Sequence, residues 1–187
     1  SEADQRGITE VLHAYNRANP VNIVMVRCLS LHLSARVGSI NAQPWPHWQT
    51  PEAPPKLPPM VNPEAMSPTV RAMALLLTNR GAQQAPSTLW PSLYRHLAHW
   101  PAFLGLATVL VPTEFEAIDA VAARMRHEVD RAAEDIAARL SISADRPVPV
   151  TATGAALQSA IDQFSGRIPE MVVIGNLLQD ALPSSAP

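Results

Sequence analysis

Residues 8–33 read ITEVLHAYNRANPVNIVMVRCLSLHL, and residues 157–182 read LQSAIDQFSGRIPEMVVIGNLLQDAL. Aligned without a gap at an offset of 149 residues, they place Pro20 on Pro169, Tyr15 on Phe164, and apolar residues on apolar residues at most positions. We interpret the two stretches as copies of one helical unit. Duplicated units commonly pack about a twofold axis, and the seam between them is a natural place for a pocket.

Helix signals dominate the chain, whereas strand signals are weak. Proline favours the first position of a helix, so the Asn19-Pro20 step predicts one helix over residues 7–18 and another over residues 20–36. The Ile168-Pro169 step predicts the same break in the second copy. We therefore predict an all-α fold made of two pseudo-symmetric helical repeats, the first of which is incomplete.

Two further helices have clear start signals. Ser67-Pro68 predicts a helix that runs to about Asn79. The Thr113–Glu116 capping box predicts another that reaches about Leu140. An apolar seam on the latter helix is predicted by residues that recur every three or four positions: Phe115, Ile118, Ala122, Met125, Val129, Ala132 and Ile136. Charged residues occupy the opposite face, which is typical of a solvated helix surface, so we assign it no catalytic role.

Proline content divides the chain into three parts. Nine of the 19 prolines lie within residues 44–68, a composition that favours extended, polyproline-like backbone. Apolar side chains such as Trp45 argue against a freely solvated tether, so we expect this segment to lie on the protein surface. The predicted organisation is the second half of the first repeat at 1–40, a proline-rich linker at 41–66 and the second repeat at 67–187.

The 187 residues carry few charges. Charged residues make up 16% of the chain, against about 25% in an average domain, and the formal net charge is −2 with no long block of one sign. Such a chain lacks the basic surface that binds nucleic acids or anionic membranes, so we expect neither partner. No apolar run reaches the roughly 18 residues of a membrane span. The single cysteine, Cys28, excludes an intrachain disulfide, and we expect a cytoplasmic protein.

Residues 86–107, PSTLWPSLYRHLAHWPAFLGLA, concentrate aromatic and histidine side chains. His96 and His99 are three residues apart and could meet a metal on one helix face. A metal site needs further ligands, and the other histidines follow no ligand spacing, so we expect no metal. Phosphate-binding and dinucleotide-binding glycine motifs are absent from the sequence, and we expect no cofactor.

Several motifs resemble the group I 2-haloacid dehalogenase family. They are YNRANPVN at 15–22, LYRHLAHWPAFL at 93–104, the IPEMVVIGN ending at 168–176, and the two-copy layout. The resemblance covers residues 7–182. It implies an all-helical fold of two repeats with the active site between them. It also implies hydrolytic removal of halide from a short 2-haloalkanoic acid by a water molecule, which an aspartate activates with help from an asparagine.

The chain departs from the family at both catalytic positions. The aspartate is expected near residues 87–90, yet no acidic residue occurs between Glu64 and Glu114. The asparagine position falls on Leu12. His96 could replace the missing base if its ring faced the seam, but its position on the helix predicts that it points elsewhere. We assign no catalytic residue and expect no halide release from 2-chloropropionate.

We expect the pocket at the seam to be lined from both copies. By the resemblance, Tyr15 and Phe164 match the aromatic positions that line the family's pocket. The candidate lining residues are Leu12, Tyr15, Asn16, Asn19, Ser87, Thr88, Trp90, Tyr94, Ile161, Phe164 and Ile168. Other roles stay open: the asparagines can serve as helix caps, Ser87 and Thr88 can form a turn, and Tyr94 can belong to the core.

Two functions follow from these expectations. The first is a dehalogenase-like protein with a small apolar pocket that hydrolyses or binds a short carboxylic acid, 2-halogenated or not. The alternative is a non-catalytic interaction or structural protein whose seam is filled by side chains. A cavity with an exposed arginine or amide favours the first, and direct contact between Tyr15 and Phe164 favours the second. An incomplete first repeat exposes an apolar face, so we also expect either a longer parent protein or a homodimer.

Overall fold

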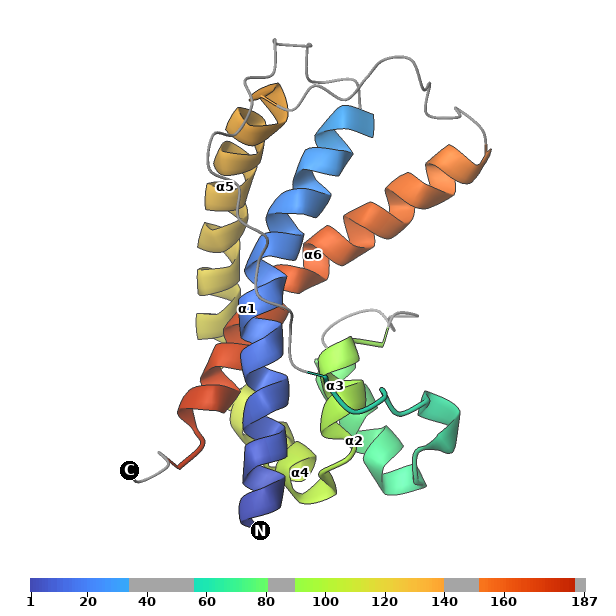
Figure 1. Ribbon diagram of the computed structural model, residues 1–187, viewed down its shortest axis with the longest axis vertical. Helices are drawn as coiled ribbons and strands as arrows, with labels where there is room; N and C mark the ends of the chain where they lie inside the picture. Colours follow the sequence, from blue (N-terminus) through green and yellow to red (C-terminus); the bar gives the residue numbers. More distant parts are fainter. Residues whose placement is uncertain (34–55, 81–89, 140–151, 184–187) are drawn as a thin grey trace.

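The structure, a computed structural model, describes residues 1–33, 56–80, 90–139 and 152–183 (Figure 1). Its elements are α1 (Glu2–Leu33), the 3₁₀-helix η1 (Pro63–Ala65), α2 (Pro68–Thr78), α3 (Ser92–Leu97), α4 (Pro101–Thr113), α5 (Phe115–Arg139) and α6 (Ala152–Asp180). Every regular element in these ranges is helical, which confirms the all-α prediction. The two helices predicted from start signals correspond to α2 and α5.

Pro20 does not begin a new helix. α1 runs unbroken through Pro20, and α6 runs unbroken through Pro169, so the predicted helix breaks are wrong. Each proline removes one backbone hydrogen bond, at a cost of about 3 kcal/mol in a helix interior. Apolar burial beside the prolines opposes this cost, because Ile23, Ile168 and Val172 form one buried cluster and each contributes about 1.5–3 kcal/mol. Packing between the two helices therefore outweighs the local signal.

α1 and α6 cross in antiparallel directions (Figure 1). Near the N-terminal end of α1, the Gln5 side chain donates to the carbonyl of Pro183, just beyond α6, at 3.0 Å. Near the other end of α1, Gln158 of α6 donates to the Ser30 hydroxyl at 3.2 Å. α5 packs against both helices. Helices from the two ends of the chain thus form one pair.

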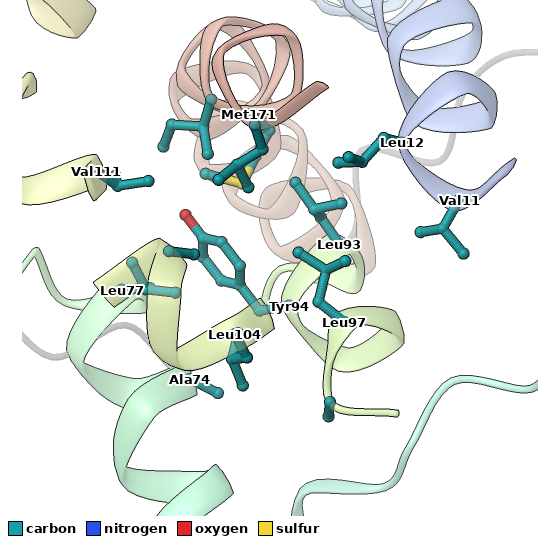
Figure 2. Close-up of a cluster of buried hydrophobic side chains, with 14 of the residues drawn as sticks. Val11, Leu12, Ala74, Leu77, Leu93, Tyr94, Leu97, Leu104, Val111 and Met171 are labelled. Carbon is teal, nitrogen blue, oxygen red and sulfur yellow. The ribbon is translucent and has the colours of Figure 1, made fainter. Parts of the chain in front are cut away.

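The largest apolar core joins α1 and α6 to the short helices α2, α3 and α4. Figure 2 shows Tyr94 of α3 among side chains from these helices. Fully enclosed leucines in this core are Leu12, Leu77, Leu93, Leu97, Leu104 and Leu178. Residues from both expected repeats therefore share one core.

α5 packs on α1 through small side chains. Ala133 and Ala137 are buried against α1. The predicted apolar seam of this helix is wrong near its end, because Ala132 is exposed whereas Ala133 is buried. A straight helix has 3.6 residues per turn, so a heptad stripe drifts by about 20° per heptad. Over the length of α5 this drift moves the buried stripe by one position.

Part of the expected linker lies against α3. The backbone N–H of Val61 donates to the carbonyl of Arg95 at 3.2 Å, and Nε of Arg95 donates to the carbonyl of Val61 at 3.1 Å. Nε2 of His99 is 2.8 Å from the carbonyl of Pro59. Residues 41–55 of this segment lie outside the described residues. The contacts hold residues 58–61 beside the site described below.

One face of α1 is both apolar and exposed. Val21, Met25 and Leu29 are 58%, 64% and 42% exposed, and they line a groove of about 520 Å³ between α1 and Ile136 of α5. Within the described ranges, no helix alone has the length and apolar character of a membrane span; α4 and α5 reach it only as a pair bent by 79°.

Candidate functional site

A cavity of about 230 Å³ lies between α1, the start of α3 and α6. Its lining residues are Tyr15, Asn19, Trp90, Pro91, Ser92, Leu93, Phe164, Arg167, Ile168 and Met171. Five predicted pocket residues are therefore brought together: Tyr15, Asn19, Trp90, Phe164 and Ile168. Tyr15 and Asn19 are one helical turn apart on α1, and Phe164 and Ile168 are one turn apart on α6. Each helix thus presents neighbouring side chains of one face to the cavity.

Two predicted pocket residues belong to the core instead. Leu12 and Tyr94 are completely buried among the side chains of the main core. Tyr94 follows Leu93, which lines the cavity. Consecutive helical residues point about 100° apart, so Tyr94 is directed toward α2 and α4. For Tyr94 the core alternative is confirmed.

The remaining candidates lie outside the cavity or outside the described residues. Asn16 does not line the cavity, because it donates to the side chain of Gln179 in α6 at 2.7 Å. Ile161 is buried without lining the cavity. Ser87 and Thr88 fall outside the described residues, so their pocket role stays a prediction.

Asn19 brings a buried amide to the cavity. The residue is only 8% exposed, and within the described part of the chain its side chain forms no hydrogen bond. The helix-cap alternative for Asn19 is wrong, because α1 continues through this position. The amide atoms of Asn19 are not among the fully enclosed side-chain atoms that lack a hydrogen-bond partner in the described part of the chain, so water in the cavity can reach them. The amide is therefore available to a molecule that enters the cavity.

Tyr15 connects the cavity to a buried histidine. Its Oη lies 2.7 Å from Nδ1 of His96, and Nε2 of His96 lies 2.9 Å from the carbonyl oxygen of Pro58. A carbonyl only accepts, so we assign the proton of neutral His96 to Nε2. Nδ1 then accepts, and Tyr15 donates. The prediction that His96 points away from the seam misses this contact, because the ring does not line the cavity but holds a residue that does.

Burial keeps both members of this pair neutral. It raises the pKa of Tyr15 to about 12 and lowers the pKa of His96 below the ordinary value of 6.5. Desolvation is the largest cause of both shifts, because burial disfavours the charged form of each group. Transfer of the proton from Tyr15 to His96 would create two charges against these shifts. The pair is therefore suited to hold Tyr15 in place rather than to act as a base at neutral pH.

Arg167 lines the cavity, and both of its terminal nitrogens contact protein groups. Its Nη2 donates to the carbonyl of Thr78 at 2.9 Å, and its Nη1 lies 3.5 Å from Oε2 of Glu170. Glu170 is buried, and its other carboxylate oxygen lies 3.9 Å from Nη2 of Arg126. A ligand in the cavity thus meets a guanidinium whose terminal nitrogens already face protein groups.

No carboxylate lines this cavity among the described residues. The same part of the chain holds no group of three or more histidine, cysteine, aspartate or glutamate side chains arranged for a metal ion. Among the described residues, a water molecule in the cavity therefore has no carboxylate base within reach. The arrangement is chemically equipped to bind a ligand by hydrogen bonds and apolar contact.

Half of the lining residues were not predicted from the sequence. Arg167 and Met171 follow Phe164 at spacings of three and seven residues, and this helical periodicity was the signal that identifies them. Pro91, Ser92 and Leu93 gave no comparable signal, because their place at the cavity depends on how α3 docks against α1. Comparison with protein-family models and with curated proteins finds no match for this chain.

Proposed function

We propose that this chain binds a small molecule in the cavity between α1, α3 and α6. The ligand has a short apolar body and a carboxyl-type head, that is, a carboxylic acid or one of its derivatives. The amide of Asn19 carries the proposal, because it lines the cavity, has no hydrogen-bond partner among the described residues and is open to a molecule that enters.

The rest of the lining supports an apolar body. Trp90, Phe164, Ile168 and Met171 contribute large apolar side chains. A volume of about 230 Å³ exceeds the roughly 30 Å³ that one water molecule occupies in the liquid, and lies below the about 300–1,000 Å³ of drug-sized pockets. A small ligand fits these limits. The cavity disfavours the alternative function, which requires a seam filled by side chains.

We also propose that α1 and α6 descend from a duplicated unit, and that the group I 2-haloacid dehalogenases are distant relatives. The contacts support this interpretation. At the sequence offset of 149 residues, Asn19 corresponds to Ile168, and both line the cavity. Ile23 corresponds to Val172, and both belong to one buried cluster. Equivalent residues meet in this way when two copies pack about a twofold axis.

Binding rather than carbon–halogen hydrolysis is the activity we propose. Hydrolysis requires a base within hydrogen-bond reach of the attacking water, and the described lining has no carboxylate. That 2-chloropropionate releases no halide stays a prediction.

Replacing Asn19 with leucine tests the proposal. Asn19→Leu is expected to raise the unfolding midpoint of the ligand-free protein, since it replaces a polar side chain that has no partner among the described residues with an apolar one beside largely apolar neighbours. It is also expected to abolish the increase in midpoint that 3-methylbutanoate or 3-methylbutanamide produces in the unmodified protein. Thermal unfolding with and without each probe measures both effects.

Asn22→Leu is the matched control, because Asn22 lies on the same helix and is exposed. We expect it to keep the response to the probes. The proposal is wrong if neither probe at millimolar concentration raises the midpoint of the unmodified protein, or if Asn19→Leu retains the full increase.

A further inference from the structure

The hydrogen bonds behind Tyr15 all point in one direction. The Pro58 carbonyl can only accept, so Nε2–H of His96 donates to it at 2.9 Å. Nδ1 of neutral His96 therefore has a lone pair, and the Tyr15 hydroxyl donates to it at 2.7 Å. The proton of Tyr15 is thus directed away from the cavity. Toward the cavity, Oη offers lone pairs and acts as an acceptor.

Ser92 lies at the edge of the same cavity. It is exposed and lines the cavity with Tyr15. Its hydroxyl can donate or accept a hydrogen bond. The acceptor character of this edge therefore comes from Tyr15, whose proton is held by His96.

Asn19, one helical turn from Tyr15 on α1, adds hydrogen-bond donors to the cavity. Its amide offers two N–H donors and one carbonyl acceptor. A carboxylate has acceptors only, so it would meet the lone pairs of Tyr15, and the terminal nitrogens of Arg167 already face Glu170 and the carbonyl of Thr78. A primary carboxamide has both N–H donors and a carbonyl acceptor. It can satisfy Tyr15 and Asn19 together.

We propose that the ligand head is a neutral primary carboxamide, with its N–H donating to Tyr15 and its carbonyl accepting from Asn19. This inference rests on the proposed function and specifies its ligand class. The apolar side chains of the cavity surround the body of the amide, as they would that of any ligand of this size.

Three matched probes test the inference by isothermal titration at pH 7.5: 3-methylbutanamide, 3-methylbutanoate and N,N-dimethyl-3-methylbutanamide. They share one apolar body and differ in the head. We expect the primary amide to bind at least tenfold more tightly than the carboxylate. The dimethylamide has a carbonyl but no N–H donor, and it is expected to lose most of this affinity.

Tyr15→Phe and Ser92→Ala locate the acceptor. Tyr15→Phe is expected to weaken binding of the primary amide several-fold and to leave the affinity for the dimethylamide unchanged. Ser92→Ala is a second variant at the cavity edge that leaves the hydrogen bond between Tyr15 and His96 intact. Equal or tighter binding of the carboxylate in the unmodified protein overturns the inference while the proposed function stands. Absence of binding by all three probes overturns the proposed function itself.

Discussion

At the scale of single residues, the approach of α1 to α6 depends on Gly175. A Cβ atom built at this position would overlap Oδ1 of Asn16, and Asn16 in turn donates to Gln179 at 2.7 Å. The overlap involves a short side chain that is already held by a hydrogen bond. Neither partner can move without disturbing the helix pair.

Gly175→Ala is therefore expected to lower the free energy of unfolding, by about 1–3 kcal/mol as in other overpacked sites. Gly166→Ala is the control, because a Cβ there meets nothing within 4 Å. That control should stabilise the protein by up to about 1 kcal/mol, since alanine favours the helix over glycine. Urea unfolding compares the two variants. Equal effects would contradict the proposed close approach.

His96 gives the protein a pH-dependent stability. Burial lowers the pKa of His96 in the folded state below its unfolded value of 6.5, so the unfolded chain binds more protons on acidification. Stability is then fully present above pH 6.5 and decreases as the pH falls below it. We expect urea midpoints to decrease from pH 7.5 toward pH 5, and His96→Asn to reduce this slope. An unchanged slope in the variant would assign the effect to other groups.

At the scale of elements, α1 and α6 each retain a proline that a helix interior disfavours. Pro20 is exposed, whereas Pro169 is buried. Replacing Pro20 restores a backbone hydrogen bond without leaving a cavity, whereas replacing Pro169 also removes buried contacts. The two prolines therefore separate backbone effects from packing effects.

Pro20→Ala is expected to raise the free energy of unfolding by up to about 3 kcal/mol, the cost of an interior proline. Pro169→Ala should give a smaller gain, because lost packing offsets the restored hydrogen bond. Thermal unfolding monitored by circular dichroism measures both. Destabilisation by Pro20→Ala would mean that the proline itself is needed at this crossing.

The same elements show how far sequence reasoning reaches. Helical spacing from Phe164 predicted both Ile161 and Ile168 at the cavity, and of these Ile168 lines it whereas Ile161 is buried elsewhere. The sequence-based prediction of helix breaks failed at Pro20 and Pro169. There, a local preference of a few kcal/mol is outweighed by apolar burial between helices that are distant in sequence. Sequence reasoning also failed for Ser92, whose position depends on the docking of a six-residue helix.

At the scale of the whole molecule, two neighbouring apolar residues of α1 occupy different surroundings. Ile23 is 3% exposed where α1, α5 and α6 meet, and Met25 is 64% exposed. The homodimer or longer parent protein predicted for the exposed face stays a prediction. The buried junction, in contrast, holds the three long helices together.

Ile23→Ala is expected to lower the free energy of unfolding by about 2–5 kcal/mol, because it leaves a cavity at this junction. Met25→Ala on the exposed face should change it by no more than about 0.5 kcal/mol. Chemical denaturation of both variants at low protein concentration makes the comparison. Similar losses in the two variants would indicate that the face of Met25 is covered in solution.

The pairing of α1 with α6 also bears on how the protein acquires its structure. During synthesis, α1 leaves the ribosome well over a hundred residues before its partner. Until then the apolar face around Ile23 has no permanent cover, and closing so long a loop slows folding. The buried contacts between α1 and α6 therefore form only after residues 152–180 have been synthesised.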